Sequence, residues 1–156
     1  TGTSRDASRL AVAAALGART VDVEATDVVF DVLEHTGGTG ADIVFDVSPV
    51  PATVPMAIAL VRAGGTVLLA GLKEGRPVEI VSDQIVNRSL SVLGGTAFTP
   101  ASLRDAVDAL NDGTVDTAPL RGAVLDLDHI EDAIDLLLRR DPERDAVRVT
   151  LRHTHR

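Results

Sequence analysis

The feature that most constrains the fold is a regular alternation of short apolar runs with helix-like segments. Nearly continuous apolar runs of strand length lie at 42–47, 66–70 and 90–93, and each is followed directly by Ser or Gly. Continuous rather than alternating apolarity is typical of strands that are covered on both faces of a parallel sheet. Helical patterns at 51–62 and 82–87 separate these runs. We therefore predict an α/β fold with a doubly wound, mostly parallel sheet of the Rossmann type.

The rest of the chain continues the alternation. Further helices are expected at 8–16, 27–35, 100–112 and 128–140, and further short strands at 20–23, 78–81, 123–127 and 146–151. Asp27 or Thr26, Ser82 and Asp128 are the expected helix N-caps. Gly64 and Gly65 are expected to end the 51–62 helix, because glycine is a poor helix former.

Composition excludes several classes of function. The formal net charge is −8 and aromatic residues make up 2% of the chain, which argues against binding to the phosphates or stacked bases of nucleic acid. No apolar run approaches the ~20 residues that span a bilayer. The polar N-terminal segment also lacks the apolar core of a signal peptide. We expect no nucleic-acid or membrane partner and a cytoplasmic location.

Small residues follow three of the predicted strands. They are Val47-Ser48, Gly71-Leu72 and Gly94-Gly95-Thr96. In open parallel sheets ligands bind beyond the carboxyl ends of the strands, and small residues there leave main-chain groups accessible to a flat ligand. The same residues also suit tight strand-to-helix turns, so spacing alone leaves both interpretations open.

The dinucleotide fingerprint G-x-G-x-x-G does not occur in the chain. Gly38-Thr39-Gly40 precedes a predicted strand instead of following one, so we interpret it as a loop. The chain begins with Thr1, and its only methionine is Met56. We therefore expect a fragment that starts after the first βα unit, where the fingerprint would lie.

Several segments, taken in order, resemble the nucleotide-binding domain of the medium-chain dehydrogenase/reductase family of zinc-type alcohol-dehydrogenase-like proteins. These segments are Ser8–Ala18, Val21–Val23, Thr36–Asp46, Val61–Leu72, Asn87–Gly94 and Ala146–Leu151, and together they cover nearly the whole chain. The resemblance implies a C-terminal fragment in which 1–120 is a partial dinucleotide-binding domain. Residues 121–156 would then return to a catalytic domain outside this chain.

The resemblance implies hydride transfer between a nicotinamide cofactor and an alcohol or carbonyl substrate in a longer parent protein. The fragment itself is expected to be inactive, with no catalytic residues of its own. Zinc would belong to the parent, with no ligands in this chain, and the parent is expected to be a homo-oligomer. The alternatives are a zinc-independent quinone or enoyl reductase, a non-catalytic Rossmann-like binding module, and, from another class, a methyltransferase-like domain.

The resemblance also implies the cofactor contacts. The turn Gly2-Thr3-Ser4-Arg5, together with Arg9, would contact the adenosine ribose. No Asp or Glu begins that turn, which favours NADP(H) as the cofactor. Asp6 lies nearby, so NAD(H) is the second choice. The other contacts would be Val47 and Ser48 on the adenine side, and Gly71, Leu72, Gly94, Gly95 and Thr96 at the nicotinamide. Arg148 would reach the pyrophosphate, or is an ordinary exposed strand residue.

Overall fold

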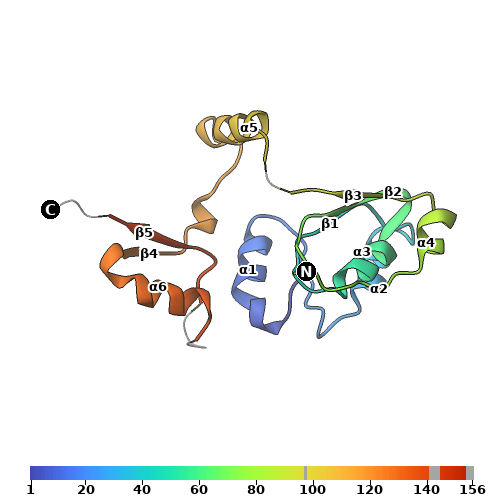
Figure 1. Cartoon of the computed structure of the whole chain (residues 1–156), viewed down its shortest axis with the longest axis horizontal. Coiled ribbons are helices and arrows are strands. Elements are labelled where there is room, and N and C mark those ends of the chain that lie inside the picture. The colour runs from blue at the N-terminus through green and yellow to red at the C-terminus, as the bar shows by residue number, and fades with distance from the viewer. Residues whose placement is uncertain (97, 141–144, 154–156) are drawn as a thin grey trace. The chain divides into compact units, whose positions relative to one another are not determined.

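The chain forms two compact units in the computed structural model, which describes residues 1–96, 98–140 and 145–153. One unit comprises Ala25–Thr99. The other combines Thr1–Glu24 with Pro100–Arg156. Figure 1 labels the helices and strands of both units, which are described separately below.

The Ala25–Thr99 unit is a three-stranded parallel sheet with connecting helices. In chain order its elements are α2 (Val28–His35), β1 (Ala41–Asp46), α3 (Thr53–Leu60), β2 (Val61–Leu69), α4 (Ser82–Asn87) and β3 (Ser91–Gly94). The strand order is β1-β2-β3, and both strand pairs are parallel. The predicted α/β fold with parallel strands is therefore confirmed.

The register of the sheet aligns the carboxyl ends of its strands. Asp46 of β1 pairs with Leu69 of β2, and Leu69 pairs with Gly94 of β3. The main chain continues this alignment, because the Ala70 amide donates to the Asp46 carbonyl oxygen at 2.9 Å and the Gly95 amide donates to the Leu69 carbonyl oxygen at 3.0 Å. The segments that follow the three strands therefore leave the sheet along one edge.

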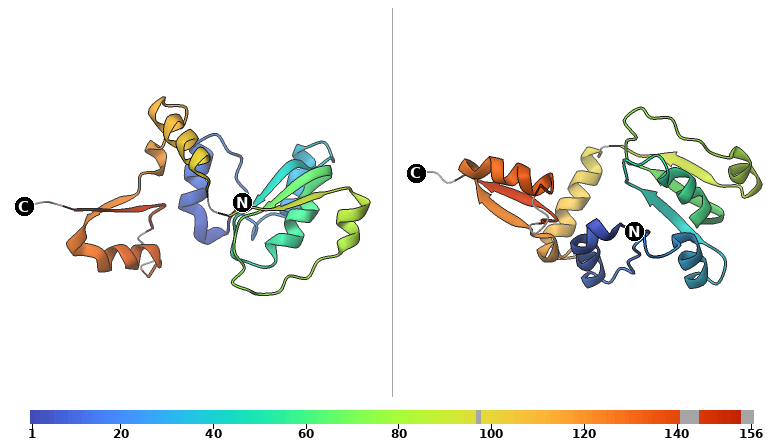
Figure 2. Two further views of the ribbon diagram at one scale, coloured as in Figure 1. Left: turned by 45° about the horizontal axis from the view of Figure 1, so that its top comes forward. Right: turned by 90° about the horizontal axis from the view of Figure 1, so that it is seen from below.

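One face of this sheet carries the core of the unit. Ala57 of α3 packs with Val61 and Val67 of β2, and partly buried Val44 and Leu69 join them. The apolar α3 also buries Ile58, which is 1% exposed. The helix thus covers the face on which Val44 and Val67 lie side by side (Figure 2).

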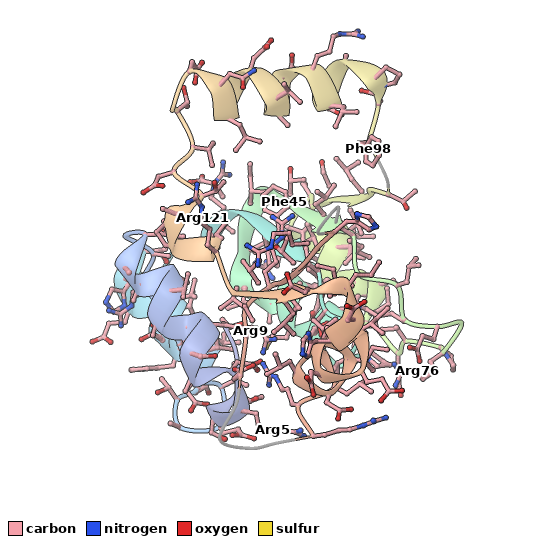
Figure 3. All side chains as sticks on the ribbon, turned by 90° about the vertical axis from the view of Figure 1, so that its left-hand side faces the viewer. Arg5, Arg9, Phe45, Arg76, Phe98 and Arg121 are labelled. Carbon is pink, nitrogen blue, oxygen red and sulfur yellow. The ribbon has the colours of Figure 1, made fainter. Side chains whose placement is uncertain are left out.

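The opposite face of the sheet is exposed. Ile43 and Phe45 of β1 are 55% and 64% exposed, and Leu93 of β3 is 51% exposed. Phe45 is labelled in Figure 3. The register places these side chains opposite the Val44–Val67 face, and no described helix of this unit covers them. The expectation of strands covered on both faces is therefore wrong for these residues.

The second unit contains a two-stranded parallel sheet and its own helices. Its elements are a short 3-10 turn (Ser4–Asp6), α1 (Ala7–Ala15), α5 (Pro100–Asn111), a 3-10 turn (Ala118–Leu120), β4 (Ala123–Asp126), a 3-10 turn (Leu127–His129), α6 (Ile130–Leu137) and β5 (Val149–Arg152). The helix α6 buries Ala133 and Leu136 and lies beside β4 and β5 (Figure 1).

Most predicted elements form, and the exceptions have local causes. Residues 20–23 make only an isolated parallel bridge between Asp22 and Gly2, because Gly2 is their single strand neighbour among the described residues. Residues 78–81 form no strand. Gly64 and Gly65 do not end a helix: α3 stops at Leu60, and the positive φ of Gly64 (68°) lets β2 bulge and continue.

The predicted caps have different outcomes. Asp27 caps α2, since its carboxylate accepts from the amides of Val29 and Phe30 at 2.9 and 3.2 Å. Ser82 and Asp128 are not caps, because α4 begins at Ser82 itself after Val81, and a 3-10 turn carries the chain past Asp128 before α6 begins. Within the described ranges, no helix combines the length and apolarity that crossing a membrane requires.

Replacing Ile58 by Ala tests the assignment of the core. Truncation of this buried side chain leaves a cavity, so we expect the free energy of unfolding to fall by about 3 kcal/mol in urea denaturation. Ile43→Ala is the matched control: the same exchange on the exposed face should change the free energy by less than about 0.5 kcal/mol. A larger cost at Ile43 than at Ile58 would contradict this assignment.

Candidate functional site

The loops that follow β1 and β2 touch through their main chains. The amide of Gly71 donates to the Asp46 carbonyl oxygen at 2.9 Å. A Cβ atom added at Gly71 would lie 2.2 Å from the Ser48 carbonyl oxygen and 2.6 Å from the Val47 carbonyl carbon. Such distances are far below van der Waals contact, so glycine is required here by the close approach of two backbones.

A buried ion pair joins the same two loops. Lys73 Nζ lies 2.8 Å from Asp46 Oδ2, and the side chains of Lys73 and Asp46 are only 10% and 3% exposed. Lys73 also donates to the Ser48 carbonyl oxygen. The Asp46 carboxylate accepts from the Ser48 amide at 3.0 Å and from Thr53 Oγ1 at 2.9 Å. Every partner of this carboxylate lies at or just after the end of a strand, or in the first turn of α3.

These contacts decide the charge state of Asp46. Burial raises the pKa of this carboxyl group, but hydrogen bonds from Lys73, the Ser48 amide and Thr53, together with the charge of Lys73, outweigh burial and hold the pKa below its usual range. The carboxylate therefore stays ionised at neutral pH. Its contribution to stability is present above the unfolded pKa and is lost as the pH falls through the lower folded value.

The end of β3 completes this edge of the sheet. Gly94 is exposed, and a Cβ atom added there would meet nothing within 4 Å. The Gly95 main chain is fixed by its bond to Leu69, and Thr96 is exposed. The structure thus brings seven predicted site residues to one edge of one sheet: Val47, Ser48, Gly71, Leu72, Gly94, Gly95 and Thr96.

The predicted ribose-binding turn at the N-terminus has its hydrogen-bond donors engaged by carboxylates. The amide and hydroxyl of Thr3 donate to Asp6 at 3.1 and 2.9 Å, and the amide and hydroxyl of Ser4 donate to Glu24. These bonds lower the pKa of both acids. Gly2 lies in the short bridge to Asp22. A ligand phosphate at this turn would have to compete with Asp6 and Glu24 for the Thr3 and Ser4 donors.

The two arginines of this turn differ in their contacts (Figure 3). Arg9 Nη1 lies 3.7 Å from Asp6 and 3.6 Å from Asp145, and Arg9 Nη2 donates to the Ala146 carbonyl oxygen at 3.3 Å. Arg5 is exposed, and no ion pair joins its guanidinium to a carboxylate of the described residues. Arg5 is therefore the more accessible cation of the two.

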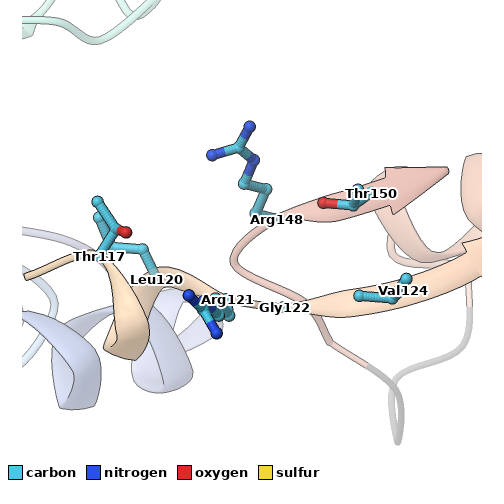
Figure 4. Close-up of a pocket in the computed structure, with 7 residues that line it drawn as sticks. All are labelled: Thr117, Leu120, Arg121, Gly122, Val124, Arg148 and Thr150. Carbon is cyan, nitrogen blue, oxygen red and sulfur yellow. The ribbon is translucent and has the colours of Figure 1, made fainter. Parts of the chain in front are cut away.

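Arg148 lies at a hollow in the second unit, away from β1–β3 in sequence. The hollow has a volume of about 410 Å³, and its polar lining includes Thr117, Arg121, Arg148 and Thr150 (Figure 4). A Cβ atom added at Gly122 would fall 1.8 Å from the Arg148 carbonyl oxygen, so the chain after Arg121 runs directly against Arg148. No carboxylate lines this hollow among the described residues, which suits it to an anion.

Sequence reasoning missed Lys73, Asp46 and Arg121. One signal for the pair was available: an apolar strand that ends in Asp46 buries a carboxylate, and a buried carboxylate needs a partner. Lys73 is the single lysine in the sequence. The position of Arg121 beside the hollow could not be predicted from the sequence, because it depends on the contact between the segment before β4 and the segment before β5.

Replacing Gly71 by Ala tests the close approach of the two loops. The new methyl group would collide with the Ser48 main chain, so we expect a loss of about 2 kcal/mol in the free energy of unfolding. Gly94→Ala serves as the control, since its methyl group meets open space and should cost less than about 0.5 kcal/mol. Equal costs for the two variants would show that the loops do not meet as described.

Comparison with known proteins identifies the family. The family of zinc-binding dehydrogenases matches residues 1–112. A probable alcohol dehydrogenase of Mycobacterium tuberculosis is 41% identical over 148 residues, which is 92% of this chain and 39% of that protein.

Solved structures agree with this match. A putative zinc-binding dehydrogenase from Sinorhizobium meliloti 1021, bound to NADP, has a TM-score of 0.78 with 31% identity over 99% of this chain and 44% of its own. The 2R,3R-butanediol dehydrogenase of Bacillus subtilis has a TM-score of 0.82 with 26% identity over 94% of this chain and 41% of its own. This chain spans about two fifths of the length of the proteins it matches. The chain belongs to the zinc-binding dehydrogenase family.

Proposed function

We propose that this chain supplies the cofactor-binding part of a longer NAD(P)-dependent oxidoreductase that transfers a hydride between nicotinamide and an alcohol or carbonyl carbon. The observation that carries the proposal is the alignment of three parallel strand ends, with small residues in the segment after each, in a member of this family. When bound, the cofactor supplies the hydride chemistry, and the protein binds and orients it.

The edge at Gly71 and Gly94 fits a flat ligand. Gly94 leaves open space beside the end of β2, and Leu72 in the loop after β2 has an exposed apolar side chain. Ser48 Oγ accepts from the Val50 amide at 3.1 Å, which leaves the hydroxyl hydrogen to donate. We assign the nicotinamide contacts to Gly71, Leu72 and 94–96, and the adenine-side contacts to Val47 and Ser48.

The anionic parts of the cofactor require cations. Arg148 is assigned to the pyrophosphate, and Arg121, which lines the same hollow, is placed to assist it. Gly2, Thr3, Ser4, Arg5 and Arg9 are assigned to the adenosine ribose, with NADP(H) preferred and NAD(H) second. Arg5 is the principal partner for a 2′-phosphate, because Arg9 is already paired with Asp6 and Asp145.

Zinc does not fit the described residues of this chain. No group of three or more His, Asp or Glu side chains among them is placed to hold a metal, and the sequence has no cysteine. No step of the proposed chemistry therefore goes through a metal held here. A zinc-independent quinone or enoyl reductase remains the alternative activity for the parent, and a non-catalytic Rossmann-like module the alternative from another class.

In the proposed parent protein, residues 1–120 belong to the dinucleotide-binding domain and residues 121–156 belong to the catalytic domain. The parent's substrate would be a small molecule, and its oligomer would pair copies of β3, one of the two outer strands of the three-stranded sheet. We expect the 156-residue chain alone to show no NADPH oxidation with a panel of aldehydes, because it spans about two fifths of its relatives. Turnover by the purified chain would contradict this division of labour.

Replacing Arg5 by Ala tests the cofactor preference. NADPH and NADH affinities would be measured for the chain by ligand-observed NMR at up to millimolar cofactor, since we expect weak binding without the first βα unit. The variant should bind NADPH roughly tenfold more weakly, because a charged hydrogen bond to the 2′-phosphate is lost, while NADH affinity stays unchanged. Arg104→Ala, an exposed arginine on α5, is the control. Equal effects on both cofactors would exclude Arg5 as the 2′-phosphate partner.

A further inference from the structure

We propose that Lys73 is a positioning residue for the dinucleotide: it locks the loop after β1 to the loop after β2 in the arrangement that the cofactor contacts require. The inference rests on the proposed function, because Val47, Ser48, Gly71 and Leu72 lie in these two loops. Lys73 itself is not among the proposed cofactor contacts.

The ammonium group of Lys73 bridges three parts of the fold. It donates to Asp46 at the end of β1 at 2.8 Å, to the Ser48 carbonyl oxygen in the loop after β1, and to Thr53 Oγ1 in α3 at 3.4 Å. A lysine ammonium has three hydrogens, and each has an acceptor within this chain. Lys73 therefore has no donor left for a ligand and acts through the loops that it joins.

A tight turn presents Lys73 to these acceptors. The Arg76 amide donates to the Lys73 carbonyl oxygen at 3.0 Å, and the two central residues, Glu74 and Gly75, have φ values of 56° and 73°. This turn returns the chain so that Arg76 Nη2 donates to the Pro49 carbonyl oxygen at 2.8 Å. Arg76 is half exposed and forms a second tie between the same loops.

Charge makes the Lys73 tie different from the Arg76 tie. Among the described residues, the groups around Asp46 are Lys73 from the loop after β2, Ser48 from the loop after β1, and Thr53 from α3. Only Lys73 is charged, so its removal leaves a buried carboxylate without a counter-ion. Burial then raises the pKa of Asp46, and the ionised carboxylate at neutral pH draws the loop toward water.

The test compares the unaltered chain with Lys73→Met and with the double variant Asp46→Asn, Lys73→Met. NADPH affinity would be measured from about pH 5 to about pH 8, because removal of the Lys73 counter-ion raises the pKa of the Asp46 carboxyl group. Lys73→Met should bind roughly tenfold more weakly at neutral pH, and the loss should shrink on acidification as Asp46 takes up a proton. The double variant loses the three Lys73 hydrogen bonds but leaves no buried charge, so its affinity should be intermediate and independent of pH.

Two outcomes overturn the inference. One is equal NADPH affinity in all three proteins; the other is a loss in Lys73→Met that is the same at every pH, which would assign Lys73 to direct ligand contact. If Lys73→Met does not fold, the double variant decides the question: it should show a weaker affinity and shifted amide resonances of Val47 and Gly71, and unchanged values would refute the role.

The inference and the proposed function fail in different ways. If the unaltered chain binds neither NADPH nor NADH, the proposed function falls, and the positioning role falls with it. If the unaltered chain binds and the variants bind equally well, the inference alone is wrong. Arg76→Met is the matched control, since it removes a tie between the same loops without leaving a buried charge, and its effect should not depend on pH.

Discussion

The ion pair between Asp46 and Lys73 joins the loops that follow β1 and β2 at the carboxyl end of the sheet. Parallel pairing aligns the ends of β1, β2 and β3, but pairing alone does not fix the loops that follow. The buried carboxylate collects donors from Ser48, Thr53 and Lys73, and Gly71 permits the resulting close approach of two backbones. Four of the seven proposed contacts, Val47, Ser48, Gly71 and Leu72, lie in these two loops and depend on that arrangement, because a change in either loop would displace Ser48 relative to Gly71.

The parallel core could be predicted because its signal is local. The runs at 42–47, 66–70 and 90–93 are continuously apolar, and the strands form there in the expected order. The exposure of Ile43 and Phe45 could not be predicted in the same way, since burial of the second face depends on what packs against it and not on the strand's own sequence. The prediction that Gly64 and Gly65 end a helix was wrong for a related reason. Glycine is compatible with both a helix end and a strand bulge, and here pairing with β1 favours the strand.

The candidate site was predictable where it depends on strand ends and unpredictable where it depends on long-range side-chain contacts. Ser48, Gly71 and Gly95 could be placed at one edge because the carboxyl ends of parallel strands share an edge. The engagement of Ser4 by Glu24 and of Arg9 by Asp145 joins residues distant in sequence, and no spacing rule anticipates it. In the proposed cofactor site, Glu24 would compete with a 2′-phosphate for the Ser4 donors.

We propose that the aligned ends of β1, β2 and β3 bind the nicotinamide dinucleotide. The most direct measurement is a residue-resolved amide NMR titration of the 156-residue chain with NADPH. We expect the largest shifts within the Ala25–Thr99 unit at 47–48, 71–72 and 94–96. Shifts in that unit confined to the exposed face of Ile43, Phe45 and Leu93, with none at the strand ends, would contradict it.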